Sequence, residues 1–190
     1  MAETVRRHPG SALLLPLAAI SFALTGCGGA GAPDDESRGV PDRAYFYESL
    51  DELAGDSDLI VTGLATSHEE RREASDPSLD WTITTVKIAS TIKSEAGDLT
   101  GTTIVVRQTG SKAHPIRDWP LLVQDETYLL ALKKSDGPDA LPSEYFISGG
   151  SAGMYKASDD LRDGASVFSA VARSSGDDLP KDVTPTDLAD

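Results

Sequence analysis

The longest stretch of β-forming residues in the chain, residues 81–92, changes the phase of its apolar pattern part-way along. A flat strand places alternate side chains on opposite faces, so one buried face cannot hold both sets of apolar residues. An extra residue near Thr84 and Thr85 would restore the phase, which predicts a β-bulge there. Bulges bend strands and are frequent where a sheet curls, so this stretch favours a small barrel. The two sets are Trp81 and Ile83 against Val86, Ile88 and Ile92.

Shorter β-forming stretches and one helical stretch accompany this strand. Apolar spacing predicts a short helix over residues 45–54, which Gly55 would end. Residues 68–80 are predicted to form a charged loop. The remaining predicted strands cover residues 59–66, 102–109, 128–132, and 145–147 paired with 154–156 as a hairpin. The sum is an all-β domain of about five or six strands with one short N-terminal helix.

The order of these segments resembles the OB-like barrel of the netrin and metalloproteinase-inhibitor type, which also occurs in bacterial secreted proteins of unassigned activity. The resemblance covers residues 45–156 and implies a closed or partly open barrel. The chain departs from the animal members because it lacks their disulfides: Cys27 is its only cysteine and has no partner within the chain. In the inhibitors a free N-terminal cysteine reaches a protease zinc, a mechanism that is not expected to carry over here. The resemblance rests on residues 57–63, 85–88, 101–106 and 125–132.

The first 26 residues have the pattern of a secretory signal peptide. Arg6 and Arg7 precede an apolar run over residues 12–24, which is shorter than the about 20 residues of a membrane-spanning helix. The run ends in Leu24-Thr25-Gly26-Cys27, which resembles the bacterial lipobox. That resemblance implies cleavage before Cys27 and a diacylglycerol on its thiol, and two acyl chains are enough for stable anchoring. An ordinary signal peptide followed by a chance cysteine is the alternative.

The rest of the chain divides by composition. Residues 27–41 are rich in Gly, Pro and acidic residues and predict a flexible tether. The β-barrel domain is predicted over residues 42–157. Residues 158–190 are acidic, with at most a weak helix over 165–172, and are predicted to be a largely disordered tail.

The charge of the chain limits its partners. There are 17 basic and 31 acidic residues, and the net charge is −14 at pH 7. Proteins that bind nucleic acid present basic faces, so nucleic acid is not expected as a partner. Adhesion to anionic lipid through charge is not expected either. The predicted location is therefore the extracytoplasmic face of the cell membrane, with the acylated Cys27 as the anchor.

No group of residues in the sequence predicts an active site, and no cofactor is expected. Residues 149–153 fit the Gly-x-Ser-x-Gly pattern, but a nucleophile at Ser151 needs a strand-to-helix elbow and a later histidine, and no histidine follows His114. A zinc site needs three or four protein ligands. His68 could contribute with Glu69 or Glu70, but His68 and His114 lie in predicted loops and are expected to be exposed, so no metal site is expected.

Three aromatic residues are candidates for a binding face. OB-type barrels use such faces for oligosaccharides, and Trp81, Trp119 and Tyr128 could form one. Trp81 and Tyr128 are also suited to a core, because they lie in predicted strands. The leading hypothesis is a lipid-anchored envelope protein that displays a non-enzymatic binding barrel, with an envelope protein or a glycan as partner. The alternatives are an envelope hydrolase that uses Ser151 or a loop metal, and a structural envelope protein.

Overall fold

The computed structural model describes residues 45–72, 80–136, 140–141, 143–162, 164–173 and 176–189. The predicted signal peptide, the predicted lipid-attachment residue Cys27 and the predicted tether lie outside these residues. Within the described part of the chain, no helix is both long enough and apolar enough to cross a membrane.

Helix α1 (Leu50–Asp56) is short and begins at a side-chain cap. The hydroxyl of Ser49 accepts a hydrogen bond from the backbone N–H of Glu52 at 3.2 Å, which satisfies one of the donors that a helix N-terminus leaves unpaired. The apolar residues Leu53 and Ala54 are buried, as their spacing predicts. The predicted helix is therefore confirmed, although it covers residues 50–56 rather than 45–54.

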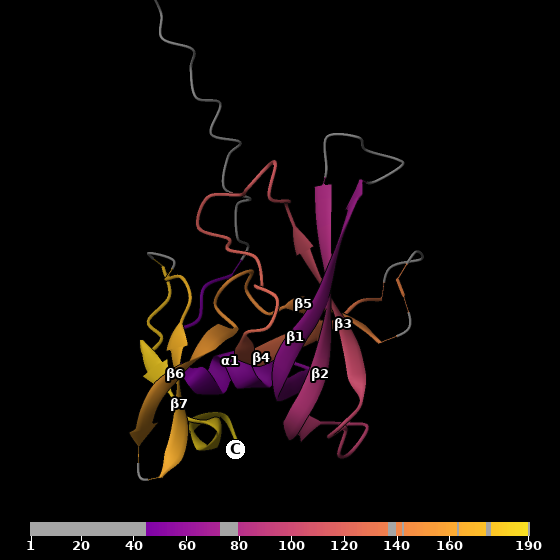
Figure 1. Ribbon diagram of the computed structural model, residues 1–190. Coiled ribbons are helices and arrows are strands. Elements are labelled where there is room, and N and C mark those ends of the chain that lie inside the picture. Colours follow the sequence, from indigo (N-terminus) through magenta and orange to yellow (C-terminus); the bar gives the residue numbers. More distant parts are fainter. Residues whose placement is uncertain are drawn as a thin grey trace, which may run out of the picture. The chain divides into compact units, whose positions relative to one another are not determined.

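Five strands close into a barrel, as predicted (Figure 1). The strand order is β1-β2-β3-β5-β4, and β4 pairs back onto β1. All neighbours are antiparallel except β3 and β5, which are parallel. This is the small OB-like barrel that the apolar pattern indicates. The strands are β1 (Leu59–Arg72), β2 (Asp80–Ser94), β3 (Thr103–Thr109), β4 (Thr127–Lys134) and β5 (Glu144–Ile147).

The predicted bulge at Thr84 and Thr85 is wrong. Strand β2 pairs with β3 without interruption from Trp81 to Lys87. The extra residue at this level lies in the partner strand β1, at Thr66, between pairs in which Ala65 faces Val86 and Ser67 faces Thr85. Two further register shifts place extra residues in β2 at Ala89 and Ile92. Bulges therefore bend the β1–β2 pair, but they do not cause the phase change.

The phase change instead reflects two covered faces of β2. Val86 and Ile88 point into the barrel and are fully buried. Trp81 and Ile83 have the opposite parity and therefore point outward. Trp81 is half-buried there because Arg107 of β3 lies over its ring. The apolar residues of β2 are therefore divided between the inside of the barrel and its covered outer face.

Among the described residues, two buried clusters lie on opposite faces of β1 and β4. The first fills the barrel and includes Leu59 and Leu130. The second lies outside the barrel and includes Ile60 and Leu129, with Leu53 of α1 packed against them. Alternate residues of a strand point to opposite faces, so both strands are apolar on both sides.

Residues 158–190, predicted to be a largely disordered tail, are mostly folded. Phe168, Val183 and Leu188 are buried in the second cluster and cover the outer face of β4 together with α1. The predicted helix over residues 165–172 is the strand β7, whose neighbour β6 continues the sheet from β4. The elements are β6 (Met154–Arg162), β7 (Ala165–Ala170), β8 (Asp182–Val183) and the 3₁₀ turn η1 (Pro185–Leu188).

The predicted hairpin between residues 145–147 and 154–156 is also wrong. Strands β5 and β6 both pair with β4, β5 near its end at Lys134 and β6 near its start at Tyr128. The link between them runs close to β4, where an added Cβ on Gly153 would lie 2.5 Å from the carbonyl oxygen of Ala131. Glycine is required there by this close approach.

Candidate binding site

A cavity of about 240 Å³ opens on the outer face of β2, β3 and β5. Trp81 of β2 and Arg107 of β3 occupy outward-facing positions and line the cavity, together with Phe146 of β5. The loop between β3 and β4 supplies Trp119, and Gly150 follows β5. Residues far apart in the sequence therefore form one aromatic pocket.

Arg107 is held between aromatic rings and a buried carboxylate. Its guanidinium carbon lies 4.0 Å from the centroid of the Trp81 ring and 6.0 Å from that of Phe146. Its Nη1 atom lies 3.4 Å from Oε1 of Glu144, whose side chain is almost fully buried. The cation–π contact and the ion pair fix the guanidinium, and Glu144 balances its charge.

Trp119 forms another wall of the pocket. Gly150 has a positive φ of 69°, and an added Cβ there would lie 2.8 Å from Cε2 of Trp119. Only glycine permits both this backbone conformation and this contact. The loop is tied to β3 by Gln108, whose Nε2 donates to the carbonyl of Pro120 at 3.0 Å and whose Oε1 accepts from the N–H of Leu122 at 2.9 Å.

The indole nitrogen of Trp81 lacks a hydrogen-bond partner among the described residues, although the atom is buried. A buried donor without an acceptor is costly and is rare in folded proteins. An acceptor on a bound molecule, or a water, would satisfy it. The pocket therefore offers aromatic surface, and the unpaired indole donor of Trp81 is shielded from solvent.

The structure brings two of the three predicted aromatic residues together. Trp81 and Trp119 line the same pocket, whereas Tyr128 is 1% exposed in the barrel core. The Tyr128 hydroxyl accepts a hydrogen bond from the N–H of Val123 at 3.0 Å, and burial raises the pKa of this hydroxyl. Sequence reasoning missed Arg107 and Phe146. Their only signal is that each occupies an outward-facing position of its strand, in the same sheet as Trp81.

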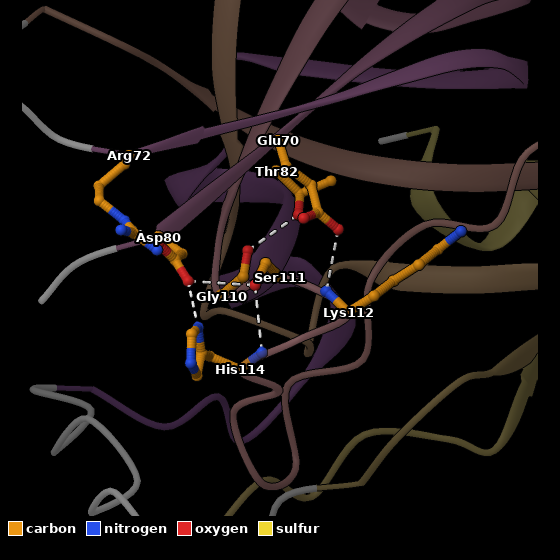
Figure 2. A network of polar contacts seen from close by, with 8 residues as sticks. All are labelled: Glu70, Arg72, Asp80, Thr82, Gly110, Ser111, Lys112 and His114. Atoms are coloured by element: carbon orange, nitrogen blue, oxygen red, sulfur yellow. Dashed lines mark hydrogen bonds and ion pairs between the residues drawn. The ribbon is translucent and has the colours of Figure 1, made fainter. Parts of the chain in front are cut away.

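A polar network joins the end of the β1–β2 hairpin to the loop that carries Trp119 (Figure 2). The carboxylate of Asp80 accepts hydrogen bonds from Arg72 Nε at 3.2 Å, from Ser111 Oγ at 3.2 Å and from His114 Nδ1. Nδ1 of His114 carries the hydrogen, because an ionised carboxylate can only accept. The hydrogen bonds from His114 and then from Arg72 hold the pKa of the Asp80 carboxyl below its usual range.

This network differs from a Ser–His–Asp triad. In a triad the imidazole stands between the serine and the carboxylate. Here the hydroxyl of Ser111 donates to Asp80 itself and accepts from the backbone N–H of His114 at 3.1 Å. The arrangement fixes the start of the loop rather than activating a hydroxyl.

The other predicted candidates are placed as follows. Ser151 is buried, and its hydroxyl has no hydrogen-bond partner within the described chain. His68 lies in β1 and not in a loop, because that strand extends to Arg72; its Nδ1 lies 3.1 Å from Oγ1 of Thr84. No cluster of three or more His, Cys, Asp or Glu side chains suited to a metal occurs among the described residues.

A scan of the chain against protein-family models found no match, and a search of curated proteins found none either. Its function is therefore inferred from the fold and from the pocket formed by Trp81, Arg107, Trp119, Phe146 and Gly150.

Proposed function

We propose that the protein is a lipid-anchored envelope protein whose barrel binds a glycan, without catalysis, in the pocket at Trp81 and Trp119. The observation that carries this proposal is the position of the pocket on the outer face of β2 and β3. OB-type barrels bind oligonucleotides and oligosaccharides on the face of strands 2 and 3. The net charge of −14 disfavours an oligonucleotide, so a glycan is the better ligand.

The chemistry of the pocket suits a sugar ring. Glu144 balances the charge of Arg107, so a neutral ligand meets no unpaired charge in the pocket. The rings of Trp81 and Trp119 line the pocket and offer flat apolar surface to the C–H face of a sugar. Pockets for small molecules usually have volumes of at least about 300 Å³. The volume here, about 240 Å³, is slightly smaller, which favours binding of one sugar ring of a longer glycan.

The proposed location is the extracytoplasmic face of the cell membrane. The apolar run over residues 12–24 and the lipobox ending at Cys27 support this location. A tether over residues 27–41 spans on the order of 20 Å root-mean-square, which lets the barrel reach a glycan away from the bilayer.

Binding is tested by titrating the detergent-solubilised protein with soluble fragments of envelope glycans. Trp81→Ala and Trp119→Ala should each weaken binding at least about tenfold, which corresponds to about 1.4 kcal/mol. Tyr45→Ala is the matched control, because Tyr45 is an aromatic residue that is 56% exposed and lies outside the pocket. Equal affinity in all three variants would rule out this pocket.

Anchoring is tested separately by intact-mass measurement of the protein from the membrane fraction. The expected mass is that of the chain cleaved before Cys27, with acyl chains on this cysteine. Cys27→Ser should remain uncleaved or leave the membrane fraction. An unmodified cysteine in the membrane-bound wild-type protein would contradict the lipoprotein proposal without affecting the proposal on the pocket.

A further inference from the structure

A second and larger cavity lies beside the β1–β2 hairpin. Its volume is about 530 Å³. Strand β1 contributes His68 and Glu70, β2 contributes Thr82, and the loop between β3 and β4 contributes Lys112 and residues 121–124. These residues do not line the aromatic pocket described above, so the two cavities are separate.

The carboxylate of Glu70 places a negative charge in the lining of this cavity. Its Oε1 atom accepts a hydrogen bond from the backbone N–H of Lys112 at 3.1 Å, which orients the carboxylate (Figure 2). Within the described chain, its Oε2 atom has no hydrogen bond. One carboxylate oxygen therefore remains for a ligand that donates.

The ammonium group of Lys112, a second lining residue, carries a positive charge. Figure 2 shows its side chain extending away from Glu70, and its ammonium forms no ion pair among the described residues. Burial and then the charge of Lys112 lower the pKa of His68, so this imidazole is neutral at neutral pH. The Nδ1 atom of His68 contacts Oγ1 of Thr84 at 3.1 Å, which leaves Nε2 for a ligand.

An apolar wall completes the cavity. Leu121, Leu122 and Val123 line it, and the Val123 side chain is 55% exposed. Exposed apolar surface inside a concave site gains about 25 cal/mol for each Å² that a ligand covers. The cavity therefore combines two opposite charges with an apolar surface.

We propose that this cavity binds a small zwitterion with an apolar side chain, such as a free aliphatic amino acid. The carboxylate of Glu70 accepts from the ammonium group of the ligand, and the ammonium of Lys112 pairs with its carboxylate. The side chain of the ligand packs on Val123 and its neighbours. A plain amine or a plain carboxylate would leave one charged group of the cavity without a partner, so a molecule with both charges is favoured.

The proposal is tested by NMR titration of the full chain in detergent with leucine, leucinamide and isocaproate. Leucinamide lacks the carboxylate and isocaproate lacks the amine. Leucine should bind at least about tenfold more tightly than either analogue. Lys112→Met should abolish the preference for leucine over leucinamide, and Glu70→Gln should abolish its preference over isocaproate. Both side chains are exposed, so neither change should affect folding.

Lys87→Met and Glu95→Gln are the matched controls, because both residues are exposed and lie outside the cavity. They should keep both preferences of the wild type. Val123→Ser should weaken the binding of leucine more than the binding of glycine, because only leucine has a side chain that packs on the apolar wall. The proposal is overturned if leucine, valine and isoleucine all bind more weakly than about 10 mM, or if the preferences persist in Lys112→Met and Glu70→Gln.

Discussion

At the scale of single residues, Asp80 joins three parts of the molecule. Its carboxylate accepts hydrogen bonds from Arg72 of β1 and from Ser111 and His114 of the loop that carries Trp119. Its backbone carbonyl accepts from the N–H of Gly110 at 2.7 Å. One ionised side chain therefore fixes the start of the loop that carries Trp119, while Gln108 holds its later residues.

The Asp80 network predicts a pH dependence of stability. Hydrogen bonds from His114 and Arg72 lower the pKa of the Asp80 carboxyl from its ordinary value of about 3.9. A carboxyl with a lowered pKa stabilises the folded state above its ordinary pKa, and this contribution is lost as the pH falls through the lowered value. Urea unfolding should show the wild type as more stable than Asp80→Asn at neutral pH, with the difference shrinking below about pH 4. A difference that stays constant over this range would contradict the assignment.

Ser151 and Ser148 are a matched pair of buried serines with opposite expectations. Ser151 has no hydrogen-bond partner in the described chain, so Ser151→Ala should leave the free energy of unfolding unchanged or raise it by about 1 kcal/mol. The Ser148 hydroxyl lies 2.8 Å from that of buried Ser57, so Ser148→Ala should cost about 1 to 2 kcal/mol. Urea unfolding measures both. Labelling of the wild type by a fluorophosphonate, lost in Ser151→Ala, would instead support the hydrolase alternative.

At the scale of elements, the β1–β2 pair shows how bulges and a glycine bend strands around a core. A register shift lies between Thr62 and Gly63 of β1. An added Cβ on Gly63 would lie 2.6 Å from Cγ1 of Val86 and 2.9 Å from the carbonyl oxygen of Lys87. The two strands therefore approach closely enough at this bend that the position admits only glycine.

Neighbouring residues of β2 should respond oppositely to the same change. Val86 is fully buried in the barrel core, so Val86→Asp should cost about 4 kcal/mol or more, as buried unpaired charges do. Lys87 is exposed on the other face, and Lys87→Asp should change stability by no more than about 0.5 kcal/mol. Thermal unfolding of the two variants checks this expectation. Similar effects of both would contradict the observed register of β2.

At the scale of the whole molecule, the described residues form a second core besides that of the barrel. The second core lies between the outer face of β1 and β4, helix α1 and the C-terminal elements β7, β8 and η1. Its largest fully buried side chains include Tyr47 and Tyr155, and burial raises the pKa of Tyr155 to about 12. The C-terminal residues therefore stabilise the domain as part of its interior.

Truncation of one C-terminal side chain tests this second core. Phe168 of β7 is 3% exposed, so Phe168→Ala should cost about 3 to 5 kcal/mol of unfolding free energy. Leu161 of β6 is 70% exposed, and Leu161→Ala should cost no more than about 0.5 kcal/mol. Denaturant unfolding of both variants measures the contrast. A small effect of Phe168→Ala would mean that the C-terminal elements do not share the core.

Local pattern in the sequence was enough to predict the strands of the barrel. Strand β3 covers residues 103–109 where 102–109 is predicted, and β4 contains the predicted 128–132. The short helix is also confirmed. These features depend on periodicity within one segment, and the alternation of side chains along a strand is fixed by its backbone.

Only the tertiary structure decided what covers each face. Alternation places Trp81 and Val86 on opposite faces of β2, but it does not indicate that Arg107 and Phe146 pack against Trp81. Residues 158–190 look too polar to fold alone, yet a few apolar side chains such as Phe168 suffice because they dock on a surface that β1, β4 and α1 already provide. The stabilisation comes from apolar area buried between segments distant in the sequence, a quantity that no single segment contains.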